Sequence, residues 1–246
     1  MVINEKYDAQ FSGIIGQDYD MLKMICPLAV EMSHLVGETL KNLTLPSQSI
    51  LKVVELGGGT GITTLSLLTA LRSMTLLSID NEPVMQNQAK SHLASWVESG
   101  QLTFELDDAL SALQKLPDSS IDVVASAYTL HNFLQSYRAK VINEIFRVLK
   151  PNGLLINGDR YALDNVSEHT QATQEEIKHY FKILVADNKL DLLQQWIIHL
   201  FNDESENHIM RENVAISQLY DAGFIQVRLT ARNGVNALVT ATKPAT

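Results

Sequence analysis

The chain has 246 residues, of which 46% are hydrophobic and 19% charged, with 19 Lys and Arg against 28 Asp and Glu. This length and balance fit one large α/β domain and exclude intrinsic disorder. The net charge of −9 disfavours nucleic acid as a partner, because nucleic acids are bound largely through Lys and Arg.

The N-terminal residues, MVINEKYDAQ, lack the basic start and apolar stretch of a secretory signal. No apolar run reaches the roughly 20 residues that span a bilayer. The single cysteine, Cys26, permits no internal disulfide and no cysteine-based zinc cage. We therefore expect a soluble, cytoplasmic protein without membrane contact.

Residues 18–43 carry apolar positions at helical spacing, interrupted at Pro27, and predict two N-terminal helices. From residue 50 onward, short apolar runs alternate with amphipathic stretches, which predicts a parallel sheet with helices on both faces. The expected strands are 50–56, 75–80, 102–106, 121–126 and 154–158. The expected helices between them are 62–72, 83–99 and 136–149.

The alternation breaks after the fifth strand. Residues 164–212 look mainly helical and rich in charge, and we expect them to form a cap over the ligand-binding edge of the sheet. A helix over 214–222 ends at Gly223, and two strands, 224–231 and 236–242, flank an Asn-Gly hairpin signal. The predicted fold is α/β: a Rossmann-like, seven-stranded, mostly parallel sheet with a C-terminal antiparallel hairpin.

We interpret residues 1–246 as a single domain with four parts. The parts are an N-terminal helical lid (1–46), a ligand-binding core (47–163), the helical cap (164–212) and a C-terminal helix and hairpin (213–246). The lid or the cap would provide the contact face of a homodimer.

The strongest local signal follows the first strand, where Glu55 precedes Gly57, Gly59 and Gly61. Glycines between a strand and a helix let the backbone approach a ligand closely, and open α/β sheets bind ligands at this edge. The sequence does not match the dinucleotide motif G-x-G-x-x-G, because the last position of the motif holds no glycine whether it is counted from Gly57 or from Gly59. It does not match a Walker phosphate loop either, because no Gly-Lys-Ser/Thr follows. The remaining pattern is E-x-G-x-G-x-G.

From about residue 51 to 158, these features resemble the class I S-adenosylmethionine-dependent methyltransferase family. The resemblance implies that the glycine loop, with Glu55, wraps the methionine end of the cofactor. It implies that Asp80, at the end of the second strand, accepts the ribose hydroxyls, a task that suits a carboxylate. It also implies that Asn81 and Met85 flank the adenosine.

Later motifs extend the resemblance. Asp107, Asp108 and Ala109 match the family's adenine-binding segment, with Asp108 the preferred acceptor. The turn at 149–153 matches the family's L-K-P-G-G turn, with Asn152 in place of a glycine. The implied cofactor is S-adenosyl-L-methionine, with S-adenosyl-L-homocysteine as product.

The resemblance implies methyl transfer, and the acidic chain and helical cap favour a small molecule or peptide tail as substrate. Transfer to oxygen, in a hydroxyl or carboxylate, is favoured. His131 is either a general base or a wall residue, and Tyr128 either faces the sulfonium or packs in the core. Arg160 pairs either with an anionic substrate group or with a surface carboxylate.

The cap and the lid supply further candidates. Four cap residues would shape the substrate pocket, and three aromatic residues of the lid would close over the cofactor. No H-E-x-x-H motif and no histidine pair one helical turn apart occurs, so we expect no metal site. The cap residues are His179, Trp196, His199 and His208. The lid residues are Tyr7, Phe11 and Tyr19.

Two alternatives remain open. Residues 13–40, 212–214 and 222–224 are also similar to carboxy-S-adenosylmethionine synthases, which grip the extra carboxylate with an arginine shortly before the E-N-V segment. The closest position here holds His208, and Arg211 follows three residues later. The other alternative is a non-catalytic, methyltransferase-like module, although a binding scaffold has no need of the glycine loop and the carboxylate after the second strand.

Overall fold

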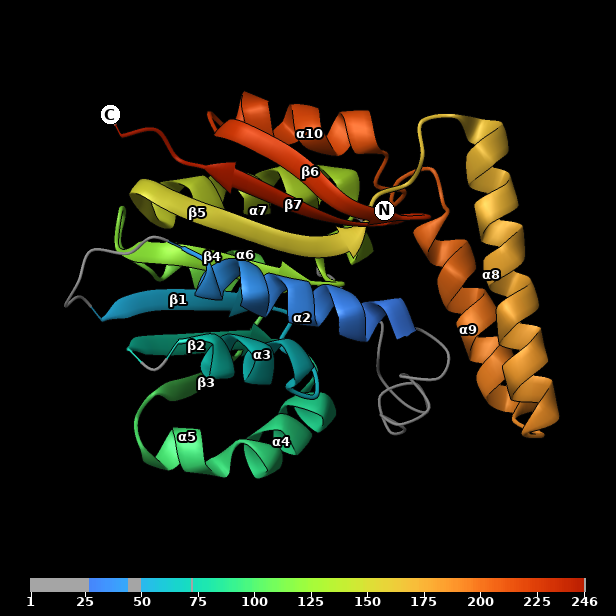
Figure 1. Ribbon diagram of the computed structural model, residues 1–246, viewed down its shortest axis with the longest axis horizontal. Helices are drawn as coiled ribbons and strands as arrows, with labels where there is room; N and C mark the ends of the chain where they lie inside the picture. Colours follow the sequence, from blue (N-terminus) through green and yellow to red (C-terminus); the bar gives the residue numbers. More distant parts are fainter. Residues whose placement is uncertain (1–26, 44–49, 72, 246) are drawn as a thin grey trace, which may run out of the picture.

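The computed structural model describes residues 27–43, 50–71 and 73–245 (Figure 1). The first predicted helix, the three lid aromatics and Cys26 lie outside the described residues. The second predicted helix is α2 (Pro27–Lys41). Proline suits its first position because an N–H group there would have no partner within the helix.

The described residues form one seven-stranded sheet with the order β3-β2-β1-β4-β5-β7-β6. All strands run parallel except β7, which pairs antiparallel with both β5 and β6. The predicted fold class is therefore confirmed. The strands are β1 (Leu51–Leu56), β2 (Met74–Asp80), β3 (Leu102–Leu106), β4 (Ile121–Ala127), β5 (Leu149–Arg160), β6 (Ile225–Asn233) and β7 (Asn236–Thr242).

Helices cover both faces of this sheet (Figure 1). One hydrophobic cluster lies between the sheet and helices α6, α7 and α10, and a second lies between the sheet and helices α2 and α3. The helices of the core are α3 (Ile62–Ala70), α4 (Pro83–His92), α5 (Ala94–Glu98), α6 (Ala109–Gln114), α7 (Gln135–Val148) and α10 (Glu212–Asp221), with a 3₁₀ turn η1 (Leu130–Asn132).

Three differences from the predicted elements exceed a shift of one or two residues at an end. The helix predicted over 83–99 is two helices, because the backbone bends at Leu93 and buries that side chain in the core. Strand β5 begins at Leu149 instead of residue 154, since residues 149–153 also pair with β4 and with the chain beyond β7. Helix α6 was not predicted, because a helix of six residues shows little periodicity.

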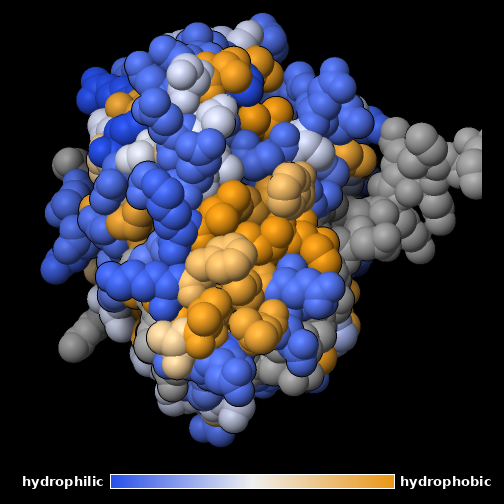
Figure 2. Space-filling model, turned by 90° about the vertical axis from the view of Figure 1, so that its right-hand side faces the viewer, coloured by the Kyte–Doolittle hydropathy of each residue, from blue (hydrophilic) through white to orange (hydrophobic). Residues whose placement is uncertain are grey.

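Helices α8 (Val166–Ala186) and α9 (Leu190–Asp203) pack together beyond the carboxyl ends of the parallel strands (Figure 1). They share a small apolar cluster that includes Tyr180 and Trp196. The predicted helical content of the cap is confirmed. Figure 2 shows this side of the molecule with apolar residues gathered on it. The exposed large apolar residues of α8 and α9 are Val166, Phe181, Val185, Leu190, Ile198 and Phe201. Among the described residues, no helix is both long and apolar enough to cross a membrane.

Candidate active site

A cavity of about 530 Å³ lies at the carboxyl ends of the parallel strands. Its walls come from the loops after β1, β2, β3 and β4, from the end of β5, from α2, the start of α3 and the β6–β7 turn, and from α8 and α9. The cavity therefore joins the predicted cofactor side of the sheet to the cap. Representative wall residues are Gly57, Asp80, Asp107, Tyr128, Arg160 and Trp196.

The loop after β1 lines the cavity with backbone. Gly57 has a φ of +71°, and a Cβ atom there would lie 1.9 Å from Oγ1 of Thr129. Gly59 also has a positive φ, of +53°, and it too lines the cavity. Gly61 instead begins α3 and leaves room for Leu93, without forming part of the wall. Gly57 and Gly59 thus expose backbone to the cavity, whereas Gly61 allows close packing against Leu93.

Glu55 lies behind this loop and is fully buried. Its Oε2 accepts hydrogen bonds from Thr64 at 2.7 Å and Ser78 at 2.6 Å, while Oε1 has no partner among the described residues. Burial raises the pKa of Glu55 to about 7. The side chain does not line the cavity, so the structure places it as a support for the loop.

Asp80 joins the loop after β1 to the loop after β2. Its Oδ2 accepts the N–H of Gly59 at 2.7 Å, and its Oδ1 accepts the N–H of Glu82 at 2.8 Å. Burial raises the pKa of Asp80 above its ordinary value. A carboxylate has about four acceptor sites, so it retains capacity for a diol. Asn81 and Met85 also line the cavity, and their contact with the adenosine stays a prediction.

The two acids after β3 have different positions. Asp108 caps α6 by accepting the N–H of Ser111 at 3.0 Å, and it also accepts the hydroxyl of Tyr137. It is absent from the cavity wall, whereas Asp107 and Ala109 line it. The sequence-based preference for Asp108 is therefore replaced by Asp107, because an aspartate directly before a helix binds the helix N–H groups.

His131 and Asp159 form a buried pair at the cavity wall. Nδ1 of His131 lies 2.5 Å from Oδ1 of Asp159, whose Oδ2 accepts the N–H of Leu130 at 3.0 Å. Although burial favours the neutral carboxyl, the nearby imidazole holds the pKa of Asp159 below its ordinary value. A carboxylate only accepts, so Nδ1 of His131 is the donor, and in the neutral form of the ring the lone pair is on Nε2.

Two neighbours fix the turn that carries His131. The fully buried Arg138 donates to the carbonyl oxygens of Leu130 and Phe133, each at 2.8 Å. Tyr128 lines the cavity, has a φ of +50° and donates its hydroxyl hydrogen to Asn236. Its ring meets that of His131 edge-on, at 5.9 Å between centroids. Tyr128 and His131 thus form one continuous wall.

Arg160 lines the cavity but is neither exposed nor unpaired. Its Nη1 lies 2.5 Å from Glu176 of α8, and its Nη2 lies 3.4 Å from Glu204, just beyond α9. Although burial disfavours its charge, the carboxylate of Glu176 raises the pKa of Arg160 well above its ordinary value. Of the two predicted partners, the structure shows carboxylates of the protein, which come from the cap, and pairing with an anionic substrate group stays a prediction.

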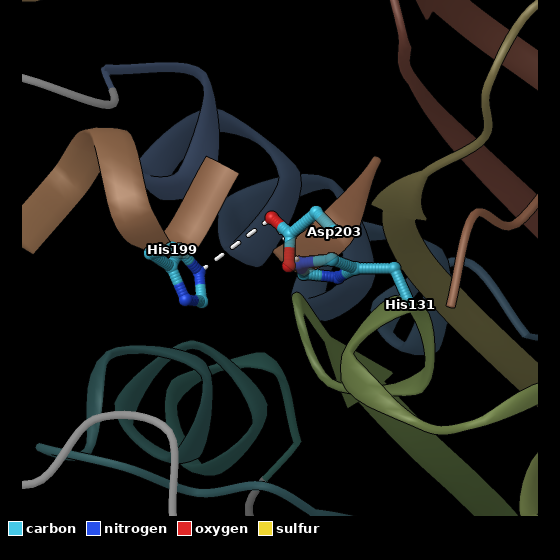
Figure 3. A group of neighbouring side chains, drawn as sticks. All are labelled: His131, His199 and Asp203. Carbon is cyan, nitrogen blue, oxygen red and sulfur yellow. Dashed lines mark ion pairs between the residues drawn. The ribbon is translucent and has the colours of Figure 1, made fainter. Parts of the chain in front are cut away.

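The cap also brings two side chains of α9 against His131 (Figure 3). Nε2 of His199 lies 3.6 Å from Oδ2 of Asp203, and Nε2 of His131 lies 3.7 Å from the same oxygen. Burial lowers the pKa of His199 and favours its neutral ring. Sequence reasoning missed Asp203, although its spacing of one helical turn from His199 was a visible signal. His179 and Trp196 also line the cavity, whereas His208 does not.

Comparison with known proteins agrees with this geometry. Residues 54–157 match the sequence model of a family described as a methyltransferase domain. The chain therefore carries a methyltransferase domain that is similar to those of the class I S-adenosylmethionine-dependent methyltransferases. S-adenosylmethionine is accordingly its cofactor, and the glycine loop and Asp80 fit that molecule because they present open backbone and remaining acceptor capacity to the cavity.

A demethylmenaquinone methyltransferase of Leptospira interrogans is 35% identical over 127 residues, which cover 52% of this chain and 48% of that protein. The match thus spans about half the length of that relative. A carboxy-S-adenosyl-L-methionine synthase of Pseudoalteromonas translucida is 25% identical over 217 residues, covering 85% and 82% of the two chains. The crystal structure of the CurJ carbon methyltransferase shares the fold, with a TM-score of 0.68 at 14% identity over 96% of this chain and 61% of that one.

Proposed function

We propose that this protein transfers the methyl group of S-adenosylmethionine to an oxygen atom of a small molecule or peptide tail. One observation carries the proposal. The same cavity is lined on one side by the loop after β1 and Asp80, and on the other by the His131–Asp159 pair and the cap. This arrangement supports a cofactor site and an acceptor site within one cavity.

The cofactor supplies an activated methyl group, so the chain's own residues have to position the acceptor and exclude water. Gly57, Gly59 and Asp80 hold the cofactor side of the cavity. The ring of Tyr128 lines the path between that side and His131, and an electron-rich ring there favours a cationic group. Trp196 of the cap encloses the acceptor side.

His131 determines whether a hydroxyl can serve as the methyl acceptor. A carboxylate acceptor needs only orientation, whereas a hydroxyl has to lose its proton. Loss of that proton depends on His131, because Asp159 fixes its ring and leaves the lone pair of Nε2 on the side of Asp203 and the cavity. Asp159 acts as a positioning residue, because it contacts Nδ1, the ring nitrogen of His131 opposite Nε2.

The cap supports a substrate of limited size. Helices α8 and α9 close the cavity at the carboxyl ends of the strands, and the charge of −9 is unfavourable for nucleic acid. The experiment is a methyl-transfer assay with radiolabelled S-adenosylmethionine against matched small acceptors: a phenol, an alcohol, a carboxylate, an amine and a thiol. We expect label on the oxygen acceptors. Label only on nitrogen, sulfur or carbon would contradict the proposal.

A second candidate function is synthesis of carboxy-S-adenosylmethionine, which the similarity to the Pseudoalteromonas enzyme over 85% of this chain favours. Two observations weigh against it. His208 and Arg211 do not line the cavity, and Arg211 donates to the carbonyl oxygen of Leu163 at 2.6 Å. Mass spectrometry of the cofactor that copurifies with the chain separates the two functions, because the carboxylated cofactor is heavier.

A further inference from the structure

We propose that His131, His199 and Asp203 bind a divalent first-row transition-metal ion, which holds the acceptor oxygen on the cap side of the cavity. One donor atom from each residue lies within 4.8 Å of those of the other two, and all three side chains are buried (Figure 3). Two histidines and one carboxylate with open positions are a recurrent ligand set for such ions.

The distances favour coordination over hydrogen bonding. The two Nε2–Oδ2 separations, 3.6 Å from His199 and 3.7 Å from His131, are too long for hydrogen bonds to Asp203. Ligand atoms bound to one ion at about 2.0–2.1 Å lie roughly 3.0–3.4 Å apart. The two distances to Asp203 exceed this range by a few tenths of an ångström, and all three donor atoms lie within 4.8 Å of one another, so small side-chain rotations bring them into coordination range.

Among the described residues, the buried carboxylate of Asp203 makes only long ion-pair contacts, of 3.6 Å or more. Its Oδ1 has no hydrogen-bond partner among the described residues, although the side chain is more than nine-tenths buried at the cavity wall. The nearest guanidinium nitrogen, Nε of Arg160, lies 4.0 Å away, and Arg160 contacts Glu176 and Glu204 more closely. Buried charges are normally paired or coordinate a metal, and a cation at this point would satisfy Asp203.

Asp159 supplies the second feature of a metal centre. A metal-binding histidine usually gives its other ring N–H to a carboxylate, which fixes the tautomer and orients the ring. Oδ1 of Asp159 lies 2.5 Å from Nδ1 of His131, so Nε2 is the nitrogen presented to the cluster. The cluster could not be predicted from the sequence, because His131 is far in the chain from the two residues of α9.

The ion would deepen the proposed function, and its use in catalysis rests on that function. A bound divalent ion lowers the pKa of a coordinated water or hydroxyl, so an acceptor hydroxyl at an open position would release its proton to solvent water more readily. In that arrangement Nε2 of His131 is a ligand, and the ion activates the oxygen. The expected substrate class is a small molecule that offers a hydroxyl or carboxylate oxygen as a ligand.

The test uses the full chain without a histidine tag, stripped with a chelator and then titrated with Zn²⁺ or Co²⁺ by calorimetry. We expect one equivalent per chain and a matching stoichiometry by elemental mass spectrometry. D203N and H199A should each weaken binding by about tenfold or more. The matched control is H179A, because His179 lines the same cavity outside the cluster, and it should bind as the wild type does.

Thermal unfolding distinguishes a variant that has lost the metal site from one that has failed to fold. A bound ion raises the melting temperature of a folded chain. D203N should melt cooperatively but show a smaller rise with Zn²⁺ than the wild type does at the same concentration. A wild-type chain that binds no ion, or a D203N chain that binds as tightly as the wild type, would overturn the proposal. Binding needs no cofactor or acceptor, so a chain that binds the ion but transfers no methyl group supports the site and contradicts only the proposed function.

Discussion

The backbone N–H of Gly59 donates a hydrogen bond to Oδ2 of Asp80 at 2.7 Å, which joins the glycine loop after β1 to the end of β2. The two parts of the cofactor site that the sequence predicts separately are therefore one unit. Because the carboxylate also accepts the N–H of Glu82, its orientation toward the cavity is set before a ligand binds.

Replacing Asp80 by alanine should weaken binding of S-adenosylhomocysteine by about 1–3 kcal/mol, or about 5- to 150-fold. The ribose hydroxyls lose an acceptor, and the glycine loop loses its anchor. Calorimetry measures the change. D118A is the control, because the exposed Asp118 pairs with Arg147 and does not line the cavity. Equal affinities for D80A and the wild type would refute the ribose assignment.

Gly57→Ala should destabilise the chain more than Gly100→Ala does. Both glycines have a positive φ, but a Cβ atom at Gly57 meets Thr129 at 1.9 Å, whereas nothing lies within 4 Å at Gly100. The backbone term costs about 1–2 kcal/mol in each variant, and the clash adds about 1–3 kcal/mol at Gly57. Urea unfolding measures both changes. If the two variants lose the same stability, the close packing of the loop against Thr129 is wrong.

His131→Gln should lower the methyl-transfer rate on a hydroxyl acceptor at least about tenfold while leaving the affinity for S-adenosylhomocysteine unchanged. The control is H208Q, because His208 does not line the cavity. A loss smaller than tenfold would show that His131 is only a wall residue.

Asp159→Asn tests whether Asp159 positions that imidazole. An asparagine side chain can donate to Nδ1, which would stabilise the other tautomer and place the lone pair away from the cavity. We expect a lower kcat with an unchanged KM for the cofactor, and a pH–rate profile that differs in shape from the wild-type profile. A D159N enzyme with the wild-type profile would contradict this role.

The sequence predicted the sheet, its terminal hairpin and the cofactor loop because these depend on local patterns: apolar runs, glycine spacing and turn residues. The helix break at Leu93 and the capping role of Asp108 were not predicted, since both depend on tertiary packing. The same holds for the cluster on the cap side. His131 meets Asp203 only because α9 packs across the strand ends, and no local spacing encodes that contact.

Glu55 should make stability depend on pH. Burial raises its pKa from an ordinary 4.5 to about 7. Between these two pH values, Glu55 is protonated in the folded chain and ionised in the unfolded chain. The stabilisation is complete below pH 4.5 and is lost as the pH rises to about 7, an effect of about 3 kcal/mol. Urea unfolding from pH 5 to 8 should show that Glu55→Gln becomes more stable relative to the wild type as pH rises. The exposed Glu98→Gln should follow the wild type, and a parallel course for Glu55→Gln would disprove the raised pKa.

A crystal structure with S-adenosylhomocysteine tests the shared cavity most directly. The ribose should lie at Asp80, the homocysteine should follow the loop at Gly57 and Gly59, and the sulfur should face the wall formed by Tyr128 and His131. A nucleoside bound outside this cavity, or none at saturating concentration, would contradict the account.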